Sequence, residues 1–418
     1  MEFNKKILIL INDSFPFKSG ETFIESEVKF YNDFNEVYIY PFPVKNGIKQ
    51  MVEVDENINI VKNNNNFGFL NKIFYSIKCL LDRVFIQEIR YLYKNKKLNV
   101  NTVIELLSFM CNGKFYTNNL YNELINKLDN NSDIYIYSYW MYIPAYIAIE
   151  LKEKLKIKKI NSIKVFSRCH RFDVYEYTHK FSYIPLRKYI VRNLDKIFSI
   201  SDDAKKYLIN RYNNLDNKIE ISRLGTFNDY IKKDVEKGKC LRIVSCSWIR
   251  PVKQVTKILE AISELEFNIE WTHIGDGEEF DKLKEMSKKL NSNIKCIFTG
   301  ALSNSEVKKT YINNDYDIFI NVSKSEGVPV SIMEAMSYGI PVIATNVGGT
   351  SEIVINKENG YLIQENFEIN ELRNYIVNIY MMNSSEYKKM RYNSRMIWEE
   401  KCCANTNYCN FIKLLKEI

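Results

Sequence analysis

Two glutamates, Glu326 and Glu334, have seven residues between them in the segment EGVPVSIMEAMSYGIPVIATNVGG (residues 326–349). Such a pair of carboxylates could act as a general acid and a general base on the two sides of a bond. It could instead accept hydrogen bonds from sugar hydroxyls, as the acidic residue of dinucleotide sites does on ribose. The choice depends on the elements that hold the two side chains.

The residues around the pair predict a helix over 329–338. Pro329 suits its first turn, Gly339 suits the position after its last turn, and Pro341 stops any continuation. Glu326 then precedes the helix, and Glu334 lies near its middle. Both carboxylates come from one short segment, so they do not face each other across a bond as those of a glycosidase do.

The start of this helix is a candidate phosphate site. The backbone amides of Gly327, Val328 and Val330 would point from the helix N-terminus toward a ligand. A structural alternative stays open: Ser331 and Glu334 match a capping box, and Glu326 could simply stabilise the helix dipole. A cap at Ser331 would leave Pro329 outside the helix and shorten it.

Short apolar runs alternate with helix-length segments along the whole chain. Their continuous apolar character predicts strands covered on both faces, and the alternation predicts parallel sheets with crossover helices. The predicted strands are residues 5–11, 36–40, 133–139, 164–169, 196–201, 241–247, 269–275, 294–299, 316–322 and 340–345. We therefore predict an α/β protein with two doubly wound domains facing across a cleft, with ligands beyond the carboxyl ends of the strands.

The pattern of alternating elements breaks at residues 226–240 (TFNDYIKKDVEKGKC), a polar and charged stretch suited to a linker. The predicted organisation is an N-terminal domain over 1–226, a linker over 227–240 and a C-terminal domain over 241–390. A chain of 418 residues is too long for a single core, which agrees with this division.

The positive charge of the chain lies in its N-terminal half. Residues 1–200 carry 29 Lys and Arg against 21 Asp and Glu, whereas residues 201–418 carry 30 of each. This asymmetry suggests that the N-terminal half faces an anionic membrane surface or a phosphorylated ligand. A solvated lysine-rich helix face, as in LKEKLKIKK (151–159), is the alternative.

The cysteines and apolar segments point to a cytoplasmic protein. The nine cysteines form no C-x-x-C pair, and the group at 402, 403 and 409 has no nearby histidine, so no metal site is expected. The beginning of the chain, MEFNKKILILINDSFPF, is predicted to be a first strand and not a signal peptide. The apolar stretch 134–149 is too short to span a bilayer and contains Pro144.

Two strings resemble ligand motifs that the context does not support. Asp315-Tyr-Asp317 spells D-x-D, but it lies at the entry of a predicted strand, so a turn and cap are expected. GDGEE (275–279) is predicted to be a turn after a strand, since a two-glycine fragment is weak support for a dinucleotide site. No P-loop occurs.

Segment 326–349 resembles the E-x7-E signature of the GT4-type retaining glycosyltransferases, the glycosyl transferases group 1 family, which have the GT-B fold. Further segments resemble the same family in the same order along the chain. They are SFPFKSGETFIESE (14–27), SRCHRFDVYE (167–176), ISDDAKKYL (200–208), RLGT (223–226), SCSWIRPVKQV (245–255), HIGDGEE (273–279) and FTG (298–300). In this fold the final segment, here 391–418, is a helical segment that returns to the N-terminal domain.

The resemblance implies a role for each matching position. Glu334 would hold the ribose hydroxyls of the nucleotide and Glu326 the donor sugar, with the backbone of Gly327, Val328, Pro329 and Val330 near sugar and phosphate. Lys253 would neutralise the diphosphate, and Gly20 would let the first loop approach the donor phosphates. His170 would sit near the donor sugar and the reacting bond. The donor-binding set is thus Gly20, Arg250, Lys253, Glu326, Gly327, Val328, Pro329, Val330 and Glu334, and the catalytic set is His170, Glu326 and Lys253.

Two positions depart from the family pattern. The family commonly has an arginine six residues before the lysine, where this chain has Ser247, and Arg250 could substitute for it. Arg171 replaces the usual glycine after the histidine, which would alter the acceptor side of the pocket.

The resemblance implies a metal-independent retaining hexosyltransferase that moves a sugar from a nucleotide-diphosphate sugar to a hydroxyl of a glycan and needs no cofactor. Its acceptor would be a lipid-linked oligosaccharide of bacterial capsule, exopolysaccharide or O-antigen assembly, and it would not bind nucleic acid. The expected location is the cytoplasm, with possible peripheral binding to the inner face of the membrane. Two alternatives stay open: a nucleotide-sugar epimerase of the same architecture and a non-catalytic subunit of a transferase pair.

Overall fold

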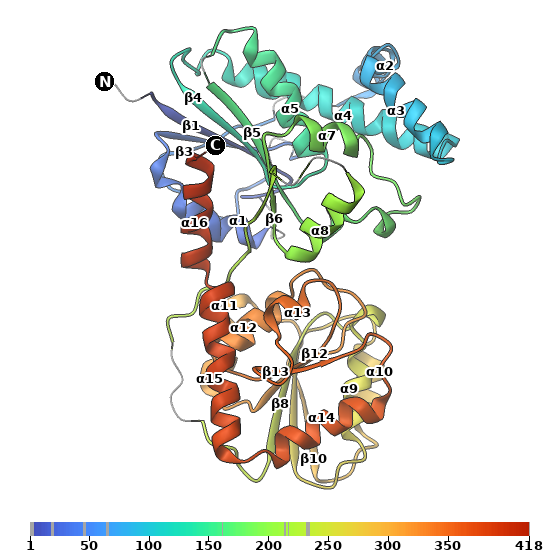
Figure 1. Ribbon diagram of the computed structural model, residues 1–418, viewed down its shortest axis with the longest axis vertical. Coiled ribbons are helices and arrows are strands. Elements are labelled where there is room, and N and C mark those ends of the chain that lie inside the picture. Colours follow the sequence, from blue (N-terminus) through green and yellow to red (C-terminus); the bar gives the residue numbers. More distant parts are fainter. Residues whose placement is uncertain are drawn as a thin grey trace. The chain divides into compact units, whose positions relative to one another are not determined.

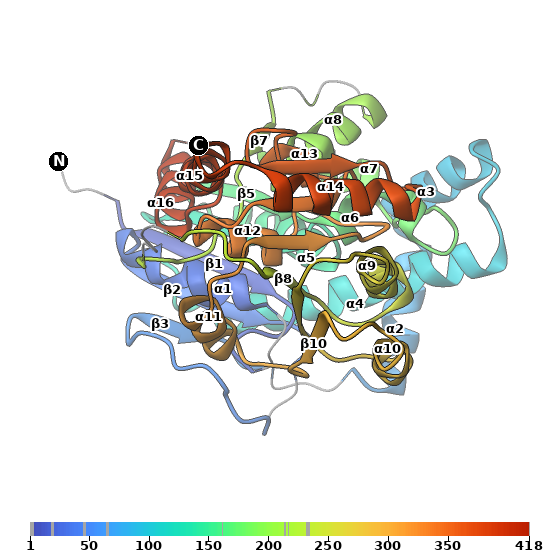
Figure 2. The same ribbon diagram turned by 90° about the horizontal axis from the view of Figure 1, so that it is seen from below.

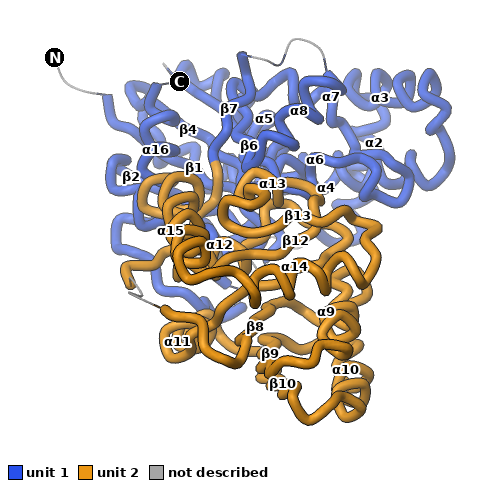
Figure 3. The backbone as a smooth tube through the Cα atoms, turned by 60° about the horizontal axis from the view of Figure 1, so that its bottom comes forward, with its two compact units in different colours: residues 1–222, 408–418 blue, residues 223–407 orange. Residues whose placement is uncertain are grey.

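The computed structural model describes residues 4–17, 21–44, 47–63, 67–160, 162–212, 215, 217–230 and 235–417. The chain divides into two compact units (Figure 3). Unit 1 comprises residues 1–222 and 408–418, and unit 2 comprises residues 223–407. In the part of the chain that the structure describes, no helix combines the length and the apolar character needed to cross a bilayer.

Unit 1 is built on a seven-stranded sheet in the order β3-β2-β1-β4-β5-β6-β7, with every neighbouring pair parallel. Its strands are β1 (Lys6–Asn12), β2 (Glu36–Pro41), β3 (Ile58–Ile60), β4 (Asp133–Ser138), β5 (Ser162–Cys169), β6 (Lys196–Ser199) and β7 (Ile219–Ile221). The helices are α1 (Thr22–Glu27), η1 (Val28–Asp33), α2 (Phe69–Leu80), α3 (Arg83–Lys94), α4 (Val100–Leu124), α5 (Ile143–Lys156), α6 (Arg171–Val174), η2 (Glu176–Thr178), α7 (Arg187–Asn193) and α8 (Asp202–Arg211), together with the part of α16 (Ala404–Lys416) from residue 408 onward.

Both faces of this sheet are covered, as the continuous apolar strands predicted. Along β1, Ile7, Ile9 and Ile11 join the core formed with α4 and α5, whereas Leu8 and Leu10 join the core formed with α1, η1 and α16. On the first face the helices are stacked, because α5 packs on β4 and β5, α4 packs on α5, and α2 packs on α4. Figure 1 shows this succession within unit 1.

Unit 2 is built on a six-stranded parallel sheet in the order β10-β9-β8-β11-β12-β13. The strands are β8 (Leu241–Cys246), β9 (Ile269–Ile274), β10 (Ile294–Phe298), β11 (Ile318–Asn321), β12 (Val342–Thr345) and β13 (Gly360–Ile363). The helices are η3 (Pro251–Lys253), α9 (Val255–Ile262), α10 (Phe280–Ser287), α11 (Asn304–Asn313), α12 (Val330–Ser337), α13 (Thr350–Ile353), α14 (Ile369–Met381) and α15 (Ser384–Lys401). One core lies between the sheet and α9 and α14, and the other between the sheet and α11, α12 and α15.

The ends of unit 2 differ in position from the boundaries expected from the sequence. Residues 227–230 and 235–240 hold no helix or strand, yet Asn228 donates to the backbone oxygen of Ser337, and the ammonium of Lys237 binds the carbonyls at the end of α14. Helix α15 packs on α12 and α13, so the chain leaves unit 2 at residue 407 and not near 390. Residues 408–418 then pack in unit 1, where Phe411 lies in the core.

Candidate functional site

The strand order of unit 2 singles out two loops. The sheet runs outward from β8 in one direction and from β11 in the other, so the neighbours β8 and β11 form its switch point. In open parallel sheets ligands bind beyond the carboxyl ends of the strands at this point. The two loops are residues 247–254, after β8, and residues 322–329, between β11 and α12.

A cavity of about 440 Å³ lies at these loops. It is lined by Cys246, Ser247, Trp248, Lys253, Ile274, Gly275, Asp276, Ala301, Leu302, Asn304, Val307, Glu326, Val328, Pro329, Val330, Ser331 and Glu334. Six of the residues expected from the sequence to bind the donor are therefore brought together here, namely Lys253, Glu326, Val328, Pro329, Val330 and Glu334. Gly20, the expected contact from the first loop, lies outside the described residues.

Lys253 and Glu326 form an ion pair at this cavity. The Nζ atom of Lys253 lies 2.6 Å from Oε1 of Glu326, whose side chain is only 11% exposed. The amide of Asn321, at the end of β11, also donates to Oε1 at 3.3 Å. Asn321 is a positioning residue that the sequence analysis did not select, although a polar side chain at the end of a buried strand was the available signal.

The helix after Glu326 begins and ends close to the predicted residues. Pro329 is the N-cap of α12, and Gly339 has a φ of +67°, the left-handed conformation expected just after a helix. The alternative of a capping box at Ser331 is wrong, because Ser331 is already inside the helix and the cap makes no side-chain hydrogen bond. The free amides of the first turn start at Val330 and lie at the cavity wall.

The paired glycines at the end of the segment hold the loop of Glu326 in place. Gly348 has a φ of +53°, and a Cβ atom there would lie 2.1 Å from the backbone oxygen of Glu326. The amide of Gly349 donates to the backbone oxygen of Gly327 at 2.7 Å. Since no larger residue fits so close to this backbone, the glycines act on the site by setting the position of residues 326 and 327.

Glu334 is a half-buried carboxyl on α12 that lines the cavity. Among the described residues no side chain is hydrogen-bonded or ion-paired to its carboxylate. Burial raises the pKa of Glu334 to about 7, and the charge of Lys308 lowers it by a smaller amount. A carboxylate held in this way would gain hydrogen bonds from the hydroxyls of a ligand.

The loop after β8 holds Ser247, one of the two positions that depart from the family pattern, and Arg250, its expected substitute. The other departing position, Arg171, is the first residue of α6 in unit 1. Gly275 has a φ of +143° and lies against the backbone of Ser247, where a Cβ atom on the glycine would be 1.9 Å from the backbone oxygen of Ser247. The GDG string that begins at Gly275 is the predicted turn. Arg250 is exposed, and its guanidinium carbon lies 5.8 Å from the centre of the Trp248 ring. Trp248 lines the cavity and Arg250 does not.

His170 lies in unit 1, directly after β5, where it is buried at the start of α6. Its backbone amide donates to Asp173, and its Nε2 lies 3.1 Å from the carbonyl oxygen of Tyr139. A carbonyl can only accept, so Nε2 carries the proton. Burial, with a smaller contribution from the charge of Arg168, lowers the pKa of His170 to about 3, so the ring is neutral.

Glu21 organises the loop after β1, next to the same histidine. Its carboxylate accepts from the amides of Asp13, Ser14 and Phe15 at 3.1, 2.7 and 2.7 Å and from the indole nitrogen of Trp140 at 2.7 Å. The Trp140 ring in turn lies 4.5 Å from the His170 ring. Glu21 lies within the motif at residues 14–27, but its role could not be predicted, since nothing local in the sequence reveals a contact across more than a hundred residues.

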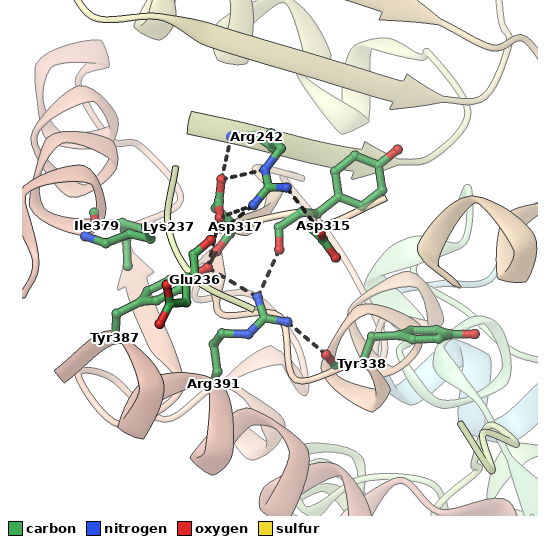
Figure 4. Close-up of polar contacts among 10 residues, drawn as sticks. Glu236, Lys237, Arg242, Asp315, Asp317, Tyr338, Ile379, Tyr387 and Arg391 are labelled. Carbon is green, nitrogen blue, oxygen red and sulfur yellow. Dashed lines mark hydrogen bonds and ion pairs between the residues drawn. The ribbon is translucent and has the colours of Figure 1, made fainter. Parts of the chain in front are cut away.

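The D-x-D string is part of a structural ion pair (Figure 4). Asp317, whose side chain is 1% exposed, accepts from the backbone and the guanidinium of Arg242 and from the Tyr387 hydroxyl. Arg391 completes the cluster by donating to the backbone oxygens of Tyr316 and Tyr338. These contacts lie at the amino ends of β8 and β11, opposite the cavity, and they join the two strands to α15.

Comparison with known proteins agrees with this geometry. A sequence profile of the family "Glycosyl transferases group 1" matches residues 227–396. A relative, the uncharacterised glycosyltransferase MJ1178 of Methanocaldococcus jannaschii, is 28% identical over 318 residues, which are 74% of this chain and 83% of that protein. Residues 227–396 therefore form a group 1 glycosyltransferase domain. Seven other curated relatives are matched over 20–44% of their own lengths.

Solved structures identify the fold of the whole chain. The lipopolysaccharide outer core galactosyltransferase WaaB superposes with a TM-score of 0.67 at 16% identity, over 99% of this chain and 100% of that one. HepE of Anabaena, in complex with UDP and glucose, superposes with a TM-score of 0.64 at 14% identity, over 98% and 99%. The prediction of a two-domain α/β protein of the GT-B fold is confirmed.

Proposed function

We propose that this glycosyltransferase binds a nucleoside-diphosphate sugar in the cavity of unit 2 and transfers the sugar, with retention at the anomeric carbon, to a hydroxyl of a glycan. The observation that carries the proposal is the placement of Lys253, Glu326 and Glu334 in one cavity at the switch point of the sheet. The three side chains suit the three parts of one donor. Lys253 suits the diphosphate, Glu326, just before α12, suits the sugar, and Glu334, on α12, suits the ribose.

The donor is held by charge and by hydrogen bonds. The ribose hydroxyls donate to Glu334, and the sugar hydroxyls donate to Glu326. Lys253 and the free amides of α12 face the diphosphate, whose charge grows as the bond to the sugar breaks. No step of this scheme uses a metal ion or a cofactor.

Transfer takes place on one face of the sugar. The bond between the anomeric carbon and the diphosphate oxygen breaks with its electron pair on oxygen, and the acceptor oxygen forms the new bond from the same side. The acceptor proton passes to a donor phosphate oxygen. In this scheme the neutral ring of His170 lies near the donor sugar and the reacting bond, and it does not take the acceptor proton, because burial lowers its pKa to about 3.

The acceptor we propose is a lipid-linked oligosaccharide of bacterial surface polysaccharide assembly, bound by unit 1. Two features support it. The excess of positive charge lies within residues 1–200, and a structural neighbour is named as a lipopolysaccharide outer core galactosyltransferase. An acceptor of this kind places the enzyme at the inner face of the cell membrane.

A screen of nucleotide sugars tests the proposal. Binding is measured by calorimetry, and the best donor is incubated with lipid-linked acceptors while NMR follows the anomeric configuration of the product. We expect a donor that binds, a product with the donor's configuration and no interconversion of the donor without an acceptor. Failure of every nucleotide sugar to bind would overturn the proposal, and conversion of the donor alone would indicate an epimerase.

A further inference from the structure

Helix α2 exposes an unusual number of large apolar side chains. Seven residues on it or just after it are between 44% and 80% exposed: Phe69, Leu70, Ile73, Phe74, Ile77, Leu80 and Leu81. Isolated apolar residues on a surface are ordinary, but a contiguous group of this size marks an interaction surface. We call these seven residues the outer face of α2.

The outer face follows from the helical period of the sequence. At 100° per residue the seven side chains fall within an arc of about 140°. The inward residues Tyr75 and Cys79 lie on the opposite side, where Tyr75 meets Phe115 of α4 with a ring separation of 5.8 Å. A helix that is apolar on two opposite sides has one side for its own protein and one for another apolar medium.

The position of α2 leaves this face uncovered. Within unit 1 it is the outermost helix of a stack in which α5 covers the sheet, α4 covers α5 and α2 covers α4. In Figures 1 and 2, α2 and α3 lie on the side of α4 that is turned away from the sheet of the same unit. The outer face therefore belongs to the periphery of unit 1.

The surroundings of the outer face are strongly basic. Residues 62–97 contain eight Lys and Arg but only two acidic residues. Both acids are engaged inward, because Asp82 lies 2.6 Å from the ammonium of Lys114, and Glu88 is buried, where it accepts from Tyr183. The exposed charges are cations: Lys72 and Lys78 on α2 and Arg83, Arg90 and Lys94 on α3.

We propose that the outer face of α2 inserts into the interfacial region of a bilayer that contains anionic phospholipids, with the cations of α2 and α3 on the headgroups. An apolar helix face bordered by lysine and arginine is the pattern that binds such surfaces. A second copy of the chain is a poorer occupant, since a two-fold contact would bring two sets of cations together.

The inference rests on the proposed function, which gives the enzyme a lipid-linked acceptor, and it names the surface that meets the lipid. Helix α3, which follows α2, contacts the segment after His170 through two interactions. Lys97, after α3, pairs with Glu176 at 3.3 Å, and Tyr183 donates to Glu88 of α3 at 3.1 Å. Docking through α2 would thus orient the unit to which we assign the acceptor.

Vesicle binding of the full chain tests the inference. The wild type is compared with the double variant Leu70→Glu/Phe74→Glu, using vesicles of phosphatidylcholine alone and vesicles with roughly one quarter phosphatidylglycerol. The matched control is Met381→Glu/Tyr392→Glu, which adds the same charge at residues of unit 2 that are 73% and 64% exposed. We expect the wild type and the control to bind the anionic vesicles, and the α2 variant to bind at least about tenfold more weakly.

Two further measurements separate the possible outcomes. Equal vesicle binding by the wild type and the α2 variant, or no binding by either, overturns the inference. So does a wild-type dimer that the α2 variant converts to a monomer, because the occupant would then be a second copy. Binding of a soluble nucleotide sugar should be the same in both proteins, and if vesicles bind while no nucleotide sugar does, the proposed function fails and the docking surface stands.

Discussion

The ammonium of Lys253 lies 2.6 Å from a carboxylate oxygen of Glu326, which joins the loop after β8 to the loop after β11. Both loops belong to the switch point of the unit 2 sheet, so the ion pair stands where a ligand is expected. A diphosphate at the cavity would compete with Glu326 for the lysine. Glu326 would therefore weaken the attraction of Lys253 for the free nucleotide while it holds the ammonium in place.

Separate replacement of the two partners should have different effects on binding and on transfer. Lys253→Ala should slow transfer by about 100-fold or more, because the leaving diphosphate loses its cation, and should weaken nucleoside diphosphate binding less. Glu326→Gln should slow transfer while nucleoside diphosphate binding stays equal or becomes tighter. Calorimetry and single-turnover rates give the two quantities. A mild effect of Lys253→Ala on transfer would point to another cation, such as Arg250.

Nucleotide binding should depend on the protonation of Glu334. Its pKa is raised to about 7 in the free protein, and hydrogen bonds donated by ribose hydroxyls would lower it. The bound state then holds fewer protons than the free state, so binding should tighten as the pH rises toward about 7, level off above that pH, and release protons in the range where it tightens. Calorimetry in buffers of different ionisation enthalpy measures this release.

Glu334→Gln is the matched variant for this effect. It keeps the size of the side chain and removes the titration, so the pH dependence near neutrality should disappear. Affinity at pH 8 should fall by about ten- to 100-fold, the loss of hydrogen bonds to a charged group. Unchanged affinity would exclude Glu334 as the ribose ligand.

The two aspartates of the D-x-D string should differ in their effect on stability. Asp317→Asn weakens the cluster with Arg242 and Tyr387 and should lower the free energy of unfolding of unit 2 by about 1–3 kcal/mol. Asp315→Asn, at a side chain that is 49% exposed, should leave both stability and transfer unchanged. Urea titration and an assay with and without a chelator check both. Loss of transfer in Asp315→Asn at normal stability, or loss with the chelator, would indicate a metal site.

The sheets were predictable because their central strands are apolar on both faces. The ten predicted strands are all present. They include two adjacent pairs in the interior of the sheets, β1 with β4 in unit 1 and β8 with β11 in unit 2. The three strands that were missed, β3, β7 and β13, are short and lie at sheet edges. An edge strand such as β7 (IEI) packs on few neighbours, so its sequence lacks a long apolar run.

The site residues that lie in one short segment could be predicted from the sequence. Those that depend on contacts between distant parts of the chain could not. Residues 326–334 form a helix and a cavity wall from local signals, namely a proline, a glycine and the spacing of the glutamates. The role of Glu21 depends on its hydrogen bond with Trp140, and the role of Asn321 depends on its hydrogen bond with Glu326. Neither partner can be identified from the sequence alone. The glycine pair at 348 and 349 was noted as a motif, but its reason, close contact with the backbone of residues 326 and 327, is purely spatial.

The state of His170 gives a last prediction that needs no substrate. The chain has three histidines, and burial holds the pKa of His170 at about 3 and that of His273 at about 4. Both rings should therefore stay neutral in the native protein, with ring-proton signals that do not move between about pH 5.5 and 8.5, where an exposed histidine titrates.

For His170, nitrogen shifts should show the proton on Nε2, which donates to the carbonyl of Tyr139. Proton-detected NMR measures both properties, and His170→Gln assigns the signal. This variant should reduce transfer without moving the acid limb of the pH–rate profile, because a ring that is neutral throughout contributes no ionisation to it. A His170 signal that titrates near neutral pH would instead make the ring a candidate acid or base in the transfer.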